Sequence, residues 1–548
     1  MGIFANPLTD LLEYEDFSRD FLKGTDPVGM TGCIDSEKVH FMSTFLGEKK
    51  VQLVVTYNEQ RAREIEEDYK LFCSQVYVIP PRDLIFFSAD LQGNAIIAER
   101  MKAFAALYQN EAKVIITTMD ALMSEAVPFE QLMSHVIKLK EGDELDLEKL
   151  KHDLTVMGYE RVGRVEEPGQ FTVHGGIADV YPLTMEVPVR IELWGDEIDT
   201  IRCFEPQSQR SMDQIESVSV FPAAEVIADD TARRRAVGMI KNELESQLAV
   251  FKKAKEPDKA KRLREETNRI LEALGEDVVL EAPDSYISYF YPRTVQLSEY
   301  FDEKNTLVFL DEPMRLKERG DGVQAEFEES MKNRLEQGFL LPGQTALLTP
   351  AKHVLAAFER GQVAALSSLD SRLADFTVVN SYAVNVQNMN TYREGFELLI
   401  KDLTHWKKEK YRIVLLCPSR TRANRIVNQL IEYDLLAYYS EDEDKKINPG
   451  EIMVTYGNLH RGFLYPMLKF AVITESDIFG VKKKKKEKKS HYQGQRISDF
   501  AQLKPGDYVV HENYGLGIYR GTERQIVDKV TKDYIKIEYG DGGKLYFP

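Results

Sequence analysis

The sequence predicts a multidomain α/β protein, and three observations support this prediction. At 548 residues the chain is too long for one hydrophobic core, and ordinary domain sizes give about three to five domains. Runs typical of buried strands alternate with helical segments over residues 1–124, which indicates a parallel sheet. Short alternating strands divided by Gly and Pro then follow, which indicates an antiparallel insert.

The composition shifts along the chain predict six segments. We expect an α/β domain whose parallel sheet is interrupted by the insert, then a small α/β domain, a Lys-rich linker and a small, strongly curved β-barrel. In chain order the predicted bounds are 1–124 (α/β, first part), 125–222 (β-rich insert), 223–370 (α/β, second part with a helical hairpin), 371–480 (small α/β domain), 481–495 (linker) and 496–548 (barrel).

Local patterns justify these elements in order. "VQLVVTY" at residues 51–57 reads as a buried strand, and Asn58 is a suitable N-cap for the helix after it. "NTLVFLDEPMR" at residues 305–315 is a strand that ends in two carboxylates. In the helical hairpin, apolar residues at spacings of three and four run from Val237 to Phe251, and a turn follows at Pro257. We expect this stripe to pack internally, and partner binding is the alternative.

A glycine-rich turn near the N-terminus resembles a phosphate-binding loop that is incomplete. Laid on the pattern G-x-x-x-x-G-K-[ST], Gly29 and Ser36 match, but Ile34 replaces the second Gly and Asp35 replaces the Lys. The candidate residues of this degenerate nucleotide site are Gly29, Gly32, Ile34, Asp35 and Ser36, with Asp311 and Glu312 where a working site would hold Mg²⁺. The loop is either a nucleotide site that has lost its function or a chance turn, and catalysis by it is not expected.

Charge and cysteine content narrow the classes of partner. A net charge of −18 argues against a large surface wrapped around nucleic acid, so proteins are the expected partners. The basic run 482–490 is predicted to be a linker, with local nucleic-acid contact as the alternative. Four widely spaced cysteines predict no metal site and no disulfide, and nothing predicts a membrane segment. We expect a cytoplasmic protein.

Two pairs of segments resemble a known family. "GRVEEPGQFTVHGGIADVYP" and "VRIELWGDEIDTIRCFEPQSQRS" are similar to the insert shared by UvrB and the transcription-repair coupling factors. "LKPGDYVVHENYGLGIYRG" and "DYIKIEYGDGGKLYFP" resemble the RNA-polymerase-interacting domain of those factors, which is similar to CarD. Their order is specific to the coupling factors, and the resemblance covers essentially the whole chain. It implies the N-terminal half of such a protein, with a degenerate helicase-like parallel sheet and a Tudor-like barrel. ATP, Mg²⁺ and most binding to double-stranded DNA would be confined to a C-terminal translocase that displaces stalled polymerase.

The resemblance also implies partners and residues. UvrA would bind His174, Arg190 and Trp194, although His174 stands where an Arg is usual. The β subunit of RNA polymerase would pair with a strand edge, with Tyr546 beside it, formed by Glu523, Arg524, Gln525 and Ile526. No cofactor is implied for this chain, which would be a non-catalytic scaffold in transcription-coupled nucleotide excision repair. The alternatives are a UvrB-type helicase-like ATPase and a stand-alone transcription regulator.

Overall fold

The computed structural model describes most of the chain as two compact units. Residues up to 481, apart from 88–94, form the first unit, and the second contains 88–94 and residues 482–548. The described residues are 7–48, 50–82, 93–275, 283–370, 376–392, 395–442, 445–479, 506–511, 515–527, 530–539 and 544–547. In these ranges no helix combines the length and apolar character needed to cross a membrane.

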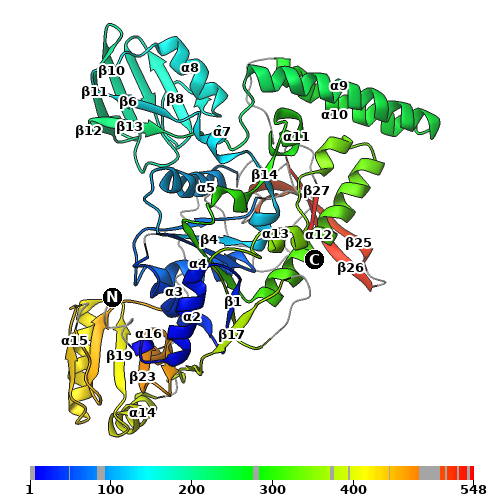
Figure 1. Cartoon of the computed structure of the whole chain (residues 1–548). Coiled ribbons are helices and arrows are strands. Elements are labelled where there is room, and N and C mark those ends of the chain that lie inside the picture. The colour runs from blue at the N-terminus through cyan, green and yellow to red at the C-terminus, as the bar shows by residue number, and fades with distance from the viewer. Residues whose placement is uncertain are drawn as a thin grey trace. The chain divides into compact units, whose positions relative to one another are not determined.

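A parallel sheet of seven described strands forms the centre of the first unit (Figure 1). Neighbours in the sheet follow the order β17 (Asn380–Ala383), β1 (Val28–Thr31), β16 (Val363–Ser367), β15 (Thr306–Asp311), β2 (Val51–Thr56), β4 (Val114–Thr118) and β3 (Val76–Ile79). All six pairings are parallel, which confirms the predicted sheet. Strands β1 and β15 are far apart in sequence, but only β16 separates them in the sheet.

Successive side chains of the central strands enter different cores, because a strand alternates its faces. Leu53 and Val55 of β2 join one core, whereas Val54 joins the other. The helices that accompany this sheet are α2 (Leu12–Lys23), α3 (Asp35–Ser43), α4 (Glu59–Tyr69), α5 (Gly93–Tyr108), α6 (Met119–Met123), α12 (Pro313–Glu336) and α13 (Ala351–Ala356). Asn58 caps α4 through its side chain, as predicted, by accepting a hydrogen bond from the Arg61 amide.

The smaller elements around this sheet connect its larger parts. They include the antiparallel pair β5 (Glu125–Ala126) and β14 (Val295–Gln296). The others are the short helices α7 (Phe129–Met133), η1 (Pro283–Tyr286), α11 (Ile287–Phe290), η2 (Leu297–Tyr300) and η3 (Pro342–Thr345).

The insert is a second, mainly antiparallel sheet, as expected. Its order is β12 (Ser211–Gln214), β11 (Glu197–Phe204), β10 (Val189–Trp194), β9 (Ile177–Val180), β8 (Gln170–His174) and β7 (Glu160–Arg161), with β7 and β8 parallel. Helix α8 (Leu147–Val156) and the pair β6 (Ile137–Lys140) and β13 (Ser217–Val220) bury apolar side chains against one face of it. The opposite face of β8 to β10 therefore presents the alternate, largely polar residues.

The helical hairpin is confirmed. Helix α9 (Asp230–Lys253) and helix α10 (Pro257–Gly275) lie side by side in Figure 1. Ile240, Leu244 and Phe251 are buried in the core shared with the parallel sheet. The predicted apolar stripe therefore packs internally.

The small α/β region forms its own sheet, which has six described strands. The order is β18 (Gln387–Asn388), β22 (Phe463–Tyr465), β23 (Phe470–Thr474), β19 (Arg412–Cys417), β21 (Ile452–Tyr456) and β20 (Ala437–Tyr439), with helices α14 (Phe396–Lys408), α15 (Arg420–Glu432) and α16 (Glu475–Phe479). Val414 and Phe463 share a core with Phe41 of α3, so this sheet packs directly against the first α/β region.

The second unit contains an antiparallel sheet of four described strands. They are β24 (Tyr508–His511), β25 (Gly515–Val527), β26 (Val530–Tyr539) and β27 (Lys544–Phe547), paired in that order. The Lys-rich run 482–490 and the turn at Asp541, predicted from the sequence, lie outside the described residues.

Candidate functional site

The degenerate loop lies where a phosphate loop would lie, between β1 and α3, but backbone closes over it. Gly32 has φ +82°, and a Cβ there would meet the Val384 carbonyl oxygen at 2.0 Å. The Val384 amide in turn donates to the Thr31 carbonyl over 2.8 Å. Gly32 is therefore required by the chain leaving β17, whose backbone occupies the space beside the loop.

The amides of the loop already have partners within the protein. The Cys33 amide donates to the Ser367 carbonyl (3.2 Å), and the Ile34 amide donates to Glu37 Oε2 (3.1 Å). A phosphate loop binds its ligand through such backbone N–H groups. Two of these donors are thus committed to the fold.

A lysine does reach the acidic pair, but from inside the helix. Lys38, in the second turn of α3, places Nζ 2.7 Å from Asp311 Oδ1 and 2.6 Å from Glu312 Oε1. Its side chain is 4% exposed and that of Asp311 is 2% exposed. Glu312 also accepts a hydrogen bond from the Ser368 amide at 2.9 Å. The two carboxylates that could hold Mg²⁺ are therefore already engaged by groups of the protein itself.

Further donors fix the carboxylate of Asp311. Thr56 Oγ1 donates to Oδ2 at 2.8 Å, and Arg61 Nε lies 3.4 Å from the same oxygen. Burial alone would raise the pKa of Asp311, but the Lys38 and Arg61 cations outweigh it and lower the pKa to about 2. Asp311 is therefore ionised and paired at neutral pH.

Asp35 and Ser36 face the small α/β sheet. Asp35, with φ +26°, begins α3, and its carboxylate lies 3.6 Å from Arg461 NH1. Ser36 is buried, and its Oγ accepts a hydrogen bond from the Arg461 amide at 2.9 Å. These side chains hold the two α/β regions together, and the Ser36 hydroxyl is not free to bind a metal ion.

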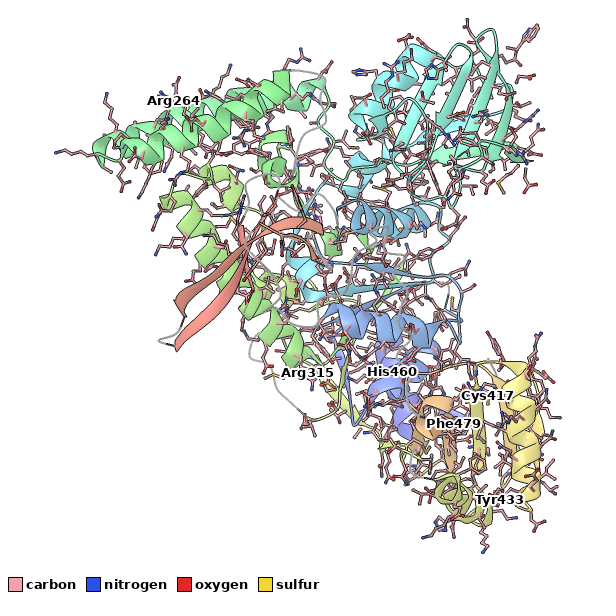
Figure 2. The ribbon with its side chains drawn as sticks, turned by 180° about the vertical axis from the view of Figure 1, so that it is seen from behind. Arg264, Arg315, Cys417, Tyr433, His460 and Phe479 are labelled. Carbon is pink, nitrogen blue, oxygen red and sulfur yellow. The ribbon has the colours of Figure 1, made fainter. Side chains whose placement is uncertain are left out.

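Two buried carboxylates, Glu37 and Asp68, lie at the same junction, where Figure 2 marks His460. Glu37 Oε1 accepts a hydrogen bond from the Tyr465 hydroxyl at 2.7 Å, and Asp68 Oδ1 accepts one from the His460 amide. Burial raises the pKa of Glu37 to about 7 and the pKa of Asp68 to about 7. The junction therefore contains groups that change charge near neutral pH.

The second candidate site lies on the open face of the insert sheet. Phe171 and Val173 of β8 point into the core, so His174 points away from it, as do Arg190 and Trp194 on β10. Strand β9 lies between β8 and β10. The three residues predicted to bind UvrA therefore share one face of the sheet.

Arg190 has a partner within the insert. Its Nε and NH2 each donate to the Asp179 carboxylate at 2.8 Å, which is a bidentate pair across β9 and β10. Its guanidinium carbon also lies 4.7 Å from the centre of the Phe204 ring. With its side chain 21% exposed, Arg190 organises this face and offers little free charge.

Trp194 is the prominent apolar group of this face. It is 83% exposed at the end of β10, and Ile177 on the neighbouring strand is 40% exposed. His174 is also exposed and pairs with Ile177 in the sheet. A large, exposed aromatic side chain on a rigid strand is typical of a protein-binding anchor.

The third candidate site is the long strand β25 of the second unit. Glu523, Arg524, Gln525 and Ile526 pair with Tyr534–Thr531 of β26 on one side. Strand β24 pairs only with Gly515–Ile518, so none of the described strands pairs with the other edge of β25 at 523–526. The expectation that Tyr546 lies beside this segment is wrong, because Tyr546 is in β27 and β26 separates the two strands.

Sequence reasoning missed the residues that close the nucleotide site. Lys38 lies three positions beyond the Lys position of the phosphate-loop pattern, and its partner Asp311 is 273 residues away. Only the structure shows that Lys38 lies in a helix whose residues Ser36 to Ser43 are all buried, where a lysine needs a countercharge. No pattern pointed to Arg61 or to Asp179.

Three family models match parts of the chain. The UvrB interaction domain matches residues 137–225, the MFD D3 domain matches 405–478, and the CarD-like/TRCF RID domain matches 503–548. The first match contains the insert sheet, the second most of the small α/β sheet, and the third the sheet of β24 to β27.

Curated relatives match over nearly the whole chain. The transcription-repair-coupling factor of Bacillus subtilis is 30% identical over 551 residues, covering 99% of this chain and 46% of the relative. Those of Staphylococcus epidermidis and Staphylococcus haemolyticus are 28% and 29% identical, covering 100% and 96% of this chain. The chain spans about half the length of the curated relatives it matches.

Fold, site and comparisons agree on the class of protein. The chain is a multidomain α/β protein with a closed phosphate-loop position, a UvrB interaction domain and a CarD-like domain. It belongs to the transcription-repair-coupling factor family.

Proposed function

We propose that this chain is a non-catalytic scaffold that links RNA polymerase to UvrA in transcription-coupled nucleotide excision repair. The observation that supports it is the presence of a UvrB interaction domain and a CarD-like/TRCF RID domain in one chain. Binding two partners at once raises the effective concentration of one near the other. The proposed mechanism is therefore tethering, and it takes place in the cytoplasm.

UvrA is the proposed partner of the open face of the insert sheet. Trp194 would be the anchor, since it is rigid, aromatic and 83% exposed. Arg190 would act mainly by keeping β9 and β10 in register through Asp179, and His174 would be a rim contact. This assignment places most of the binding energy on Trp194.

The β subunit of RNA polymerase is the proposed partner of the CarD-like domain. The edge of β25 at Glu523–Ile526 offers main-chain donors and acceptors to an incoming strand. A small, curved Tudor-like barrel is the shape that we propose for this domain. Tyr546, two strands away in β27, would lie at the periphery of this contact.

The parallel sheet of this chain would not bind ATP. Lys38 bridges the two carboxylates of the acidic pair, and backbone from Val384 covers Gly32. We assign ATP, Mg²⁺, displacement of stalled polymerase and most contacts with double-stranded DNA to the remainder of the relatives' length. The alternative is a UvrB-type ATPase, and nucleotide binding separates the two.

The test is a paired titration of this chain against UvrA and against the polymerase β subunit, each with and without ATP. We expect both partners to bind and ATP to change neither affinity. Failure to bind either partner would refute the scaffold proposal, and hydrolysis of ATP would favour the alternative of a UvrB-type ATPase.

Two separate variants, Arg524→Pro and Gln525→Pro, test which edge of β25 docks on the polymerase. Each change removes one amide donor, and successive amides of a strand point to opposite edges. The variant whose lost donor faces the unpaired edge should lose β-subunit binding and keep UvrA binding. Unchanged β-subunit affinity in both variants would move the docking strand elsewhere.

A further inference from the structure

Positive charge is concentrated at the closed end of the helical hairpin. Residues 252–264 contain seven basic and two acidic side chains, a net charge of +5 in a chain whose net charge is −18. We call this segment the basic tip; its cations are Lys252, Lys253, Lys255, Lys259, Lys261, Arg262 and Arg264. The hairpin adjoining the tip instead carries acidic residues, among them Glu243, Glu245, Glu265 and Glu266.

The backbone at the turn holds the first three lysines in the open. Helix α9 ends at Lys253, and Lys255 takes the left-handed conformation with φ +58°. Phe251 points into the core and is 4% exposed, whereas the three lysines after it are all exposed. The cations therefore surround a turn fixed by the packing of the two helices.

Five of these cations form no ion pair in the described part of the chain, and they are Lys252, Lys253, Lys255, Arg262 and Arg264. Arg262 donates instead to the Gln337 carbonyl at 2.9 Å, and Figure 2 marks Arg264 on α10. Lys259 pairs with Glu256 at 2.9 Å within the tip. A helix surface that is merely solvated usually mixes both signs, so this separation of charge calls for an external anion.

The chemistry of the tip favours the phosphate backbone of a nucleic acid duplex. Five of the seven cations are lysines, which contact phosphates as point charges and do not read bases bidentately. Phe251, the aromatic residue nearest the turn, is buried. Phe339 is exposed beside the tip, but the Arg262 guanidinium carbon lies 4.6 Å from the centre of its ring and occupies one face on which a base could stack. Apart from the Lys-rich run 482–490, which lies outside the described residues, the remainder of the chain has a net negative charge and would repel a duplex.

We propose that the basic tip of the α9–α10 hairpin binds the sugar-phosphate backbone of double-stranded DNA without sequence preference. This contact is separate from the proposed UvrA and polymerase surfaces. Through this contact the chain itself binds DNA weakly and in a salt-sensitive manner.

The test compares two triple variants of the full chain. Lys252→Glu/Lys253→Glu/Lys255→Glu reverses the tip, and Lys407→Glu/Lys408→Glu/Lys410→Glu is the matched control. The control carries the same K-K-x-K pattern at the end of α14, with its last lysine also left-handed at φ +66°. Both variants change the net charge and the helix end identically.

Binding is measured by fluorescence anisotropy of a short labelled duplex at several salt concentrations. The tip variant should bind at least about tenfold more weakly, and its log–log salt slope should fall by roughly 2 to 3, since each lost phosphate contact removes about 0.9. The control should stay within about twofold of the original chain. Circular dichroism and UvrA binding check that both variants are folded.

Three results would overturn the proposal. They are an unchanged duplex affinity in the tip variant, an equal loss in the control, and binding of polyglutamate or single-stranded DNA as tight as that of the duplex. If charge reversal disturbs α9, the neutral set Lys252→Gln/Lys253→Gln/Lys255→Gln replaces it, and the same salt slope decides.

Discussion

Replacing Lys38 by Met tests whether the acidic pair is held by an internal cation. Methionine keeps the apolar stem and removes the ammonium group that lies 2.7 Å from Asp311 and 2.6 Å from Glu312. Asp311 would keep Thr56 and the more distant Arg61. A buried carboxylate would then be only partly compensated.

The expected magnitude follows from burial. Removing one partner of a buried ion pair costs about 3–5 kcal/mol. A pKa of about 2 for Asp311, below its ordinary 3.8, corresponds to roughly 2 kcal/mol of stabilisation at neutral pH. Since this pKa is depressed, that stabilisation is complete above pH 3.8 and is lost as pH falls toward 2. We therefore expect Lys38→Met to lower the free energy of unfolding by about 3 kcal/mol at pH 7.

The assay is urea-induced unfolding at pH 7, followed by circular dichroism, in a double-mutant cycle with Asp311→Asn. The double variant should lose at least about 1 kcal/mol less than the two single losses combined, because both changes remove the same interaction. A loss below about 1 kcal/mol for Lys38→Met, or strict additivity, would refute the internal pair. Calorimetry with ATP supplies an independent check, since the original chain should bind none.

The remaining predictions concern the insert, the junction and the loop. Trp194→Ala should weaken UvrA binding by about 2 kcal/mol or more and leave the melting temperature unchanged. Arg190→Ala should both weaken UvrA binding and lower the melting temperature. Calorimetric titration measures the affinity and thermal melts the stability, and unchanged UvrA affinity in both variants would remove this face from the site. Asp68→Asn should be as stable as the original chain near pH 4 and more stable than it at pH 8, by at most about 4 kcal/mol. Burial raises the pKa of Asp68 from 3.8 to about 7, so the original chain loses stability as pH rises between these two values. Urea midpoints of both chains at pH 4 and pH 8 check this, and a parallel pH dependence of the two chains would contradict it. Gly32→Ala should lower the melting temperature, since φ +82° and a close carbonyl both oppose a Cβ, while Gly47→Ala, which has open space, should not; equal melting temperatures would show that the loop can relax.

Much of the fold was predictable because its signals are local. The strand and helix around Gly29, the strand ending at Asp311 and the hairpin up to Gly275 all follow from periodicity, caps and turn residues within short windows. Resemblance to a family added the partners and pointed to Trp194. A strand pattern predicts on which face of the sheet Trp194 lies, but it does not predict that the side chain is 83% exposed.

The sequence by itself determined which segments are strands and helices, that the insert interrupts a parallel sheet, and that the phosphate-loop pattern lacks its lysine. The tertiary structure decided that Lys38 satisfies Asp311, that the Val384 carbonyl covers Gly32, and that β26 separates Tyr546 from β25. The physical reason is the range of the interactions. Periodicity and capping act between residues a few positions apart, whereas countercharges, close backbone approaches and strand order join residues that only the folded chain brings together.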